Sequence, residues 1–117
     1  MGFDQYHEPA GELPEEARSF ARLIASLTEE AEAIGWYQQR LALEKDATAG
    51  AIMRHAQKEE FLHFAMDLEW LSRKLPDWRI ALRSILFREG DIVDNAERGE
   101  SRQEEHDRRV ATGDGAR

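Results

Sequence analysis

The residues between Pro14 and about Lys45 repeat in the pattern of a helix that packs along one seam. Proline suits the first turn of a helix, and the acids Glu15 and Glu16 suit the positive end of its dipole, so we expect the helix to begin here. The seam advances in alternating steps of three and four residues through Phe20, Leu23, Leu27, Glu30, Ile34, Tyr37 and Leu41. This heptad spacing is typical of helical bundles and coiled coils. Glu30 is the exception, because it places a carboxyl among apolar neighbours.

A second seam predicts a helix from about Ala51 to Lys74, which ends before Pro76 because proline cannot continue a helix. Polar residues again occupy the middle of the seam, whose members are Ile52, Ala56, Glu60, His63, Met66 or Asp67, and Trp70. The connection over residues 46–50 is short. We therefore expect the two helices to form an antiparallel hairpin roughly 40 Å long.

The remaining segments complete an all-α organisation. Residues 1–12 contain proline and glycine without an apolar period and predict an extended arm. Residues 77–87 predict a short third helix that ends near Gly90, so that residues 13–90 form one domain. Charged residues crowd the segment 91–117, which predicts a mobile or partly helical tail because such a segment buries too little apolar surface to order itself.

The composition limits the kinds of partner and metal site that the chain can have. The chain has 117 residues, enough for one core, and its 16 basic and 24 acidic residues give a net charge of −8, which argues against nucleic-acid binding. It contains no cysteine, so a metal site must use carboxylates and imidazoles, the ligands of Fe, Mn, Mg or Ca. We find no export signal and no apolar run long enough for a membrane span, and therefore expect a cytoplasmic protein without membrane partners.

The polar seam residues suggest half of a metal centre. Glu60 and His63 form a Glu-x-x-His motif, whose spacing places both side chains on one helix face. Carboxylate-bridged di-iron bundles use two such motifs and one glutamate from each of two further helices. Two chains that each supplied Glu30, Glu60 and His63 would complete that set. Glu59, four residues before His63, competes with Glu60, and spacing alone does not separate the two.

Two segments together resemble a known family. The sequences TEEAEAIGWYQQR at 28–40 and EEFLHFAMDLEWL at 59–71, with the early His7-Glu8-Pro9 and the later Leu86-Phe87, resemble the encapsulated ferritins over roughly residues 7–90. The resemblance implies a ferritin-like half-bundle, in which the two-helix hairpin and a short C-terminal helix complete a four-helix bundle by dimerisation. It further implies that the dimers assemble into a ring-shaped decamer.

The same resemblance implies an activity and a partner. These proteins are ferroxidases that oxidise Fe(II) to Fe(III) with dioxygen at a di-iron centre between two subunits, with two iron ions at each dimer interface. They store iron together with an encapsulin shell, which would place this chain in a cytoplasmic encapsulin nanocompartment. Members that enter the shell usually end in a short Gly-Ser-Leu-Gly-Ile-type targeting peptide, which is not evident in this chain.

Matching positions imply roles for individual residues. Glu30, Glu60 and His63 correspond to the iron ligands, which selects Glu60 over Glu59. Tyr37 corresponds to a tyrosine that steadies the ligand histidine by hydrogen bonding. An outer site for calcium or another divalent cation, on the approach to the centre, corresponds to Glu29, Glu32 and Trp36, and His55 falls near the same route.

Two alternatives stay open. The same ligands accept manganese, so the chain could be a different Mn or Fe di-metal protein that handles redox chemistry or peroxide. A lone Glu-x-x-His is also common on charged helices as a solvated pair. The chain could therefore be a helical interaction module without enzymatic activity, whose seam acids pair with basic residues of a partner.

Overall fold

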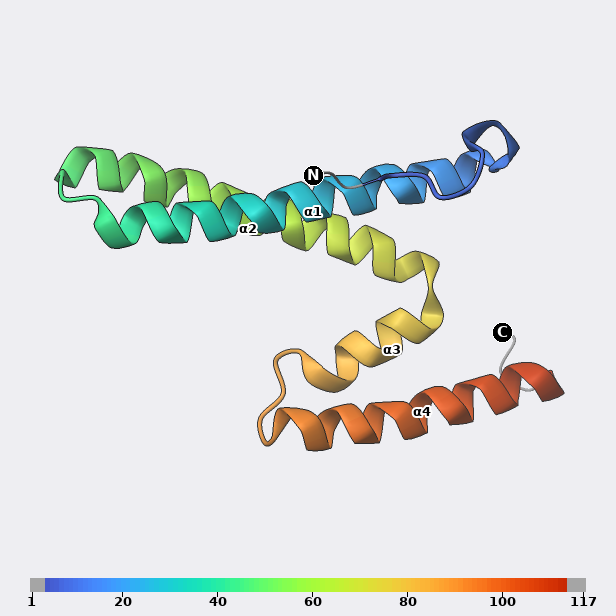
Figure 1. The fold of residues 1–117 in the computed structure, drawn as a ribbon. Coiled ribbons are helices and arrows are strands. Elements are labelled where there is room, and N and C mark those ends of the chain that lie inside the picture. Colours follow the sequence, from blue (N-terminus) through green and yellow to red (C-terminus); the bar gives the residue numbers. More distant parts are fainter. Residues whose placement is uncertain (1–3, 114–117) are drawn as a thin grey trace. The chain divides into compact units, whose positions relative to one another are not determined.

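The computed structural model describes residues 4–113, and within this range every regular element is helical. A 3-10 turn, Ala10–Glu12, precedes four α-helices (Figure 1): α1, Glu15–Leu43; α2, Ala47–Lys74; α3, Pro76–Ile85; and α4, Ile92–Thr112. The prediction of an all-α chain is confirmed. None of the helices in the described range is long and apolar enough to cross a lipid bilayer.

The chain divides into two compact units between Leu71 and Ser72, near the end of α2. The first unit contains α1 and most of α2, and the second contains the last residues of α2 with α3 and α4. Within the second unit, α3 and α4 pack closely against each other. The expected domain of residues 13–90, in which the third helix belongs with the hairpin, stays a prediction.

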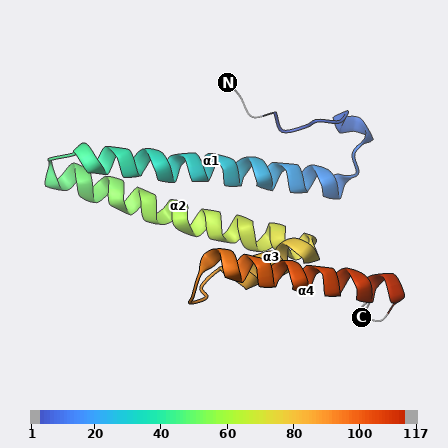
Figure 2. The same cartoon turned by 60° about the horizontal axis from the view of Figure 1, so that its bottom comes forward.

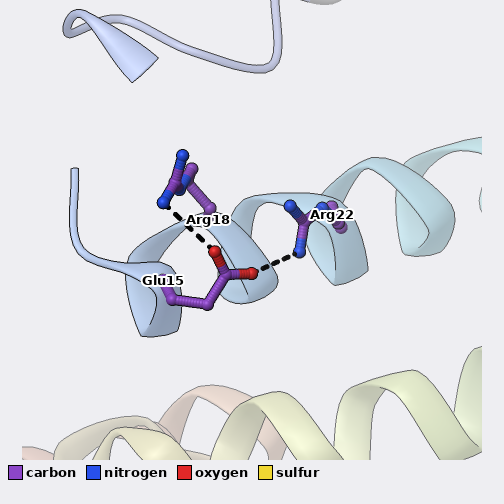
Figure 3. Close-up of polar contacts among 3 residues, drawn as sticks. All are labelled: Glu15, Arg18 and Arg22. Atoms are coloured by element: carbon purple, nitrogen blue, oxygen red, sulfur yellow. Dashed lines mark hydrogen bonds and ion pairs between the residues drawn. The ribbon is translucent and has the colours of Figure 1, made fainter. Parts of the chain in front are cut away.

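The start of α1 follows the sequence closely. The helix begins at Glu15, directly after Pro14. The Glu15 carboxylate binds Arg18 and Arg22 at 3.1 and 3.0 Å (Figure 3). The hydrogen bond from Arg22 and the charges of both arginines lower the pKa of Glu15. The carboxylate is therefore held at the positive end of the helix dipole, where it stabilises the first turns.

The start of α2 differs from the prediction. The helix begins at Ala47, four residues before the expected start, and only residues 44–46 separate it from α1. Asp46 explains the difference, because its Oδ2 accepts a hydrogen bond of 2.9 Å from the backbone N–H of Ala49. Aspartate is a strong N-cap residue, so the segment that we had interpreted as a loop becomes the first turn of the helix.

The first unit is an open hairpin. Its two helices run antiparallel (Figure 2), and the Nε2 of Gln57 on α2 donates to the carbonyl of Ile34 at 3.2 Å and to Oε1 of Gln38 at 3.0 Å. No residue of α1 is buried. Large apolar side chains lie about half exposed or more along both helices: Trp36, Leu43, Ile52, Phe61, Leu62 and Met66. Exposed apolar side chains mark an interaction site where they adjoin one another.

The second unit is a close-packed hairpin of α3 and α4. A Cβ at Gly99 would lie 2.8 Å from the Cβ of Ser84, so only the small side chain of Ser84 separates the two helices at this point. Ser84 is buried, donates to the carbonyl of Ile80 at 2.8 Å and accepts from Arg102 Nη1 at 2.9 Å. Asn95, also buried, donates to the carbonyl of Glu89 at 3.2 Å. Small and polar residues therefore hold α3 to α4.

These contacts explain the order of the charged tail. We expect residues 91–117 to be mobile or partly helical, and the helical part is α4, which runs without a break from Ile92 to Thr112. The Asp91 side chain caps its start by accepting from the N–H of Asp94 at 2.9 Å. Gly113 ends it with a left-handed conformation, φ 84°. Good caps and a buried polar seam supply the stability that the composition alone did not reveal.

Candidate metal centre

Four polar side chains of the first unit form one cluster. Glu30 comes from α1, and Glu60, His63 and Asp67 come from α2, where steps of three and four residues place them on one face. His63 Nδ1 and Glu60 Oε1 lie 3.0 Å apart. The two helices bring these groups near one another, so that Asp67 and Glu60 raise the pKa of Glu30 and the charge of His63 lowers it.

The carboxyls of Glu30 and Asp67 form an unusual pair. Glu30 Oε2 and Asp67 Oδ2 are buried and have no hydrogen-bond partner in the described structure. Burial first, and the neighbouring Asp67 carboxyl second, raise the pKa of Glu30 to about 7. Two ionised carboxylates offer acceptors only, so neither can satisfy the other without a proton or a cation between them. When both carboxyls are ionised, the pair is therefore a site of negative charge that only a proton or a cation can compensate.

The imidazole of His63 lies in the same acidic surroundings. Its hydrogen bond with Glu60 is the main cause that raises the pKa of His63, and the negative charges of Glu60, Glu30 and Glu59 add to the effect. The His63 side chain is 48% exposed and that of Glu60 is 23% exposed, so an ion can reach both from solvent. Carboxylate oxygens with one imidazole nitrogen are ligands suited to Fe(II) and Mn(II).

The orphaned oxygens of Glu30 and Asp67 fit a divalent cation. A cation bound there would neutralise the negative charge of the two carboxylates, which no protein group compensates. Within residues 4–113 of a single chain, however, no three histidine or acidic side chains converge closely enough to hold a metal ion.

Glu59 and Glu60 occupy different surroundings. Glu60 bonds with His63, whereas Glu59 lies 3.6 Å from the ring of His55, and both members of that second pair are mostly exposed. Tyr37 lies beneath the guanidinium of Arg40, 5.3 Å from the ring centroid. No hydrogen bond joins Tyr37 to His63 among the described contacts of one chain.

The residues expected at the outer cation site share a single face of α1. Glu29, Glu32 and Trp36 follow one another in steps of three and four, and all three are exposed. They form an acidic surface on the helix that also carries Glu30.

Sequence reasoning missed Asp67 as a site residue. Asp67 and Met66 were alternatives for one position of the second seam, and the structure distinguishes them. Met66 is 62% exposed, whereas Asp67 is partly buried with one orphaned oxygen. The step of four residues from His63 to Asp67, equal to one helical turn, was the signal that could have identified it.

The chain is similar to known ferritin-like proteins. The EncFtn-like family matches residues 5–89, a range that contains the whole cluster and ends before α4. A "Ferritin-like protein" of Thermotoga maritima is 48% identical over 91 residues, which cover 78% of this chain and 80% of that protein. An "Encapsulated ferritin-like protein" of Rhodospirillum rubrum is 45% identical over 87 residues, which cover 74% of this chain and 62% of that protein.

A solved structure shows the same similarity. The crystal structure of a Nitrosomonas europaea protein superposes with a TM-score of 0.72 at 43% sequence identity, and the match covers 76% of this chain and 98% of that one. The family match extends over most of the chain, and both named relatives are ferritin-like proteins. The chain therefore belongs to the EncFtn-like family of encapsulated ferritins.

Proposed function

We propose that the chain is a ferroxidase, which oxidises Fe(II) to Fe(III) with dioxygen at a di-iron centre shared by two copies of the chain. The observation that carries the proposal is the pair of orphaned carboxyl oxygens on Glu30 and Asp67 beside the Glu60–His63 pair. Iron is the substrate of this reaction. Each Fe(II) ion gives up one electron, and dioxygen accepts the electrons.

The charge of the cluster and the packing of its helices both suggest that two copies of the chain form the di-iron centre. The helices that carry the cluster also expose large apolar side chains, among them Trp36, Phe61 and Met66, and a second copy would cover such a surface. Two copies of Glu30 and Glu60 supply four carboxylates, which balance two divalent cations. Without metal, the same carboxylates would repel one another across the interface.

The chain's own residues bind the iron and favour its oxidised form. Anionic oxygen ligands from Glu30 and Glu60 stabilise the harder ferric ion more than the ferrous ion. Asp67 adds a further anionic oxygen beside Glu30. The hydrogen bond between Glu60 and His63 holds the imidazole in one orientation before iron arrives.

Residues around the centre would guide iron towards it. The acidic face formed by Glu29 and Glu32, next to Trp36, attracts divalent cations, calcium included, and raises their local concentration. His55 lies with Glu59 on the neighbouring helix. Tyr37 would bond with His63 of the second copy or of its own chain once the centre forms. We also propose that the chain forms a homo-oligomeric ring of ten copies. The name of the encapsulated ferritin-like relative supports the proposal that this chain delivers ferric product inside an encapsulin shell in the cytoplasm.

The test is aerobic Fe(II) oxidation followed by absorbance of the ferric product. We expect a Glu60→Ala, His63→Ala double variant to lose most of the rate of the parent. A His7→Ala, Glu12→Ala variant removes the same two residue types from exposed positions outside the α-helices and should keep the parental rate. A Glu60→Ala, His63→Ala protein as fast as the parent would refute the proposal.

The oxygen and nitrogen donors also favour a second candidate, a dimanganese protein that handles redox chemistry or peroxide, because Mn(II) accepts the same ligands. Metal analysis of protein isolated from cells and the stoichiometry of oxygen and peroxide consumption separate the two. An interaction module without enzymatic activity predicts instead that assembly does not depend on metal, which size measurements with and without Fe(II) decide.

A further inference from the structure

Asp67 gives the candidate metal centre more negative charge than two ferrous ions can balance. Each chain contributes three carboxylates, from Glu30 on α1 and from Glu60 and Asp67 on α2. Two copies contribute twice three, or six, negative charges. Two Fe(II) ions together carry four positive charges, whereas two Fe(III) ions carry six. The full set of carboxylates therefore matches the charge of a ferric pair.

The position of Asp67 places its carboxylate beside the other ligands. Asp67 follows His63 by four residues, about one helical turn, so the two side chains lie on one face of α2. Its carboxyl lies within hydrogen-bonding reach of Glu30 on the opposite helix. One oxygen of each carboxyl is buried, and neither oxygen has a hydrogen-bond partner in the described part of the chain. An ion bound by Glu30 and His63 would therefore lie next to an Asp67 oxygen that no other group occupies.

No basic side chain supplies the missing positive charge. Among residues 4–113, no lysine or arginine forms an ion pair with Glu30 or Asp67. His63 is the group of opposite charge that acts on Glu30. An imidazole that binds a metal ion must be neutral, so His63 loses its own positive charge when the ion arrives. The bound ions must therefore compensate the carboxylates alone.

We propose that Asp67 makes the centre selective for trivalent over divalent ions, so that the ferric product is held more tightly than the ferrous substrate. The inference rests on the proposed di-iron centre and concerns its preference between ions. The attraction between a carboxylate and an ion grows in proportion to the charge of the ion. Asp67 therefore adds half as much again to the binding free energy of a trivalent ion as to that of a divalent ion.

The size of this preference follows from the loss expected for a divalent ion. Removing a group that supports a metal site weakens binding about 10- to 100-fold. With the free energy scaled by the charge of the ion, the same change weakens a trivalent ion about 30- to 1,000-fold. The ratio of trivalent to divalent affinity should thus fall about 3- to 10-fold in Asp67→Asn. For a one-electron couple, this corresponds to a reduction potential of the bound iron about 30–60 mV higher.

Equilibrium dialysis of the full chain under argon, against Ga(III) or Mn(II) buffered by nitrilotriacetate, measures the preference. Ga(III) resembles Fe(III) in size and charge, Mn(II) resembles Fe(II), and neither changes its oxidation state under these conditions. We expect the ratio of Ga(III) to Mn(II) affinity to fall about 3- to 10-fold in Asp67→Asn. The fold should persist, because the new amide can donate to the orphaned oxygen of Glu30.

Two matched variants separate charge from other effects. Asp67→Glu keeps the charge and should keep the parental ratio. Asp107→Asn removes the same charge from an exposed position on α4 and should leave the ratio unchanged. An unchanged ratio in Asp67→Asn would overturn the proposal, as would a fall of the same size in either matched variant. Potentiometric titration of the iron-loaded protein is the second measurement, and equal potentials in the parent and Asp67→Asn would contradict the proposal.

The Glu60→Ala, His63→Ala variant assigns the measured ions to the centre, because it should bind Ga(III) and Mn(II) far more weakly than the parent. Parental binding of both ions by this variant would place them elsewhere and overturn the proposal. None of these measurements depends on the rate of iron oxidation. The proposed ferroxidase activity fails only if the double variant oxidises Fe(II) as fast as the parent, so the two proposals can fail separately.

Discussion

Replacing Glu30 by glutamine should stabilise the metal-free protein above neutral pH. The substitution keeps the shape of the side chain and removes the charge that burial and Asp67 oppose. In most proteins the loss of a partly buried polar contact destabilises the fold. Here the expected sign is the reverse, because Glu30 Oε2 has no donor to lose in the described structure.

The pKa of Glu30 sets the magnitude and the pH window. A rise from 4.5 to about 7 on folding corresponds to at most about 3 kcal/mol, and the partial exposure of the side chain reduces this by screening to about 1–2 kcal/mol. The folded state binds the proton more tightly, so the penalty is absent below pH 4.5 and complete above about pH 7. The raised pKa of His63 acts in the same direction, because its favourable contact with Glu60 is lost as pH rises.

Urea unfolding in chelator at pH 5 and pH 8, at one protein concentration, measures the effect. We expect Glu30→Gln to exceed the parent by about 1–2 kcal/mol at pH 8 and to match it at pH 5. Glu29→Gln, a change to the exposed neighbour, should leave the unfolding free energy unchanged at both values. A Glu30→Gln protein that is less stable than the parent at pH 8 would refute the reasoning, as would a gain of equal size at both pH values.

Four further substitutions test the fold and the site. Gly99→Ala should destabilise the chain by about 1–3 kcal/mol in urea unfolding because its Cβ would collide with Ser84, whereas Gly35→Ala, with nothing within 4 Å, should stabilise it by about 0.5–1 kcal/mol. Asp46→Ala should cost about 1 kcal/mol in the same assay by removing the cap of α2. Asp67→Asn should weaken anaerobic Fe(II) binding roughly 10- to 100-fold in a titration, and unchanged affinity would exclude Asp67 from the site.

The long helices were predictable because their pattern is local. The heptad seam of α1 and the pair Pro14-Glu15 fix its start within the sequence itself, and Pro76 fixes the end of α2. The start of α2 was placed too late because Gly50 suggested a loop. The side chain of Asp46 decided the outcome instead, since a capped first turn tolerates a glycine.

The helical order of α4 was harder to predict from the sequence, because it depends on contacts with another helix. Its sequence is strongly charged, and charge alone favours a solvated tail. The close approach at Gly99 and the hydrogen bond from Arg102 to Ser84 appear only when α3 lies alongside. Pairings between residues 15 or more positions apart leave no periodic trace in a single sequence.

Some residues of the candidate site were likewise predictable from the sequence, and one was not. Glu30 stood out because a carboxyl interrupts an apolar seam, and the spacing of Glu60 and His63 places them on a common face without reference to the rest of the chain. Asp67 was missed because its importance comes from the orphaned oxygen that faces Glu30 on the other helix. Spacing can predict which residues share a helix face, but it does not show which buried atoms lack a partner.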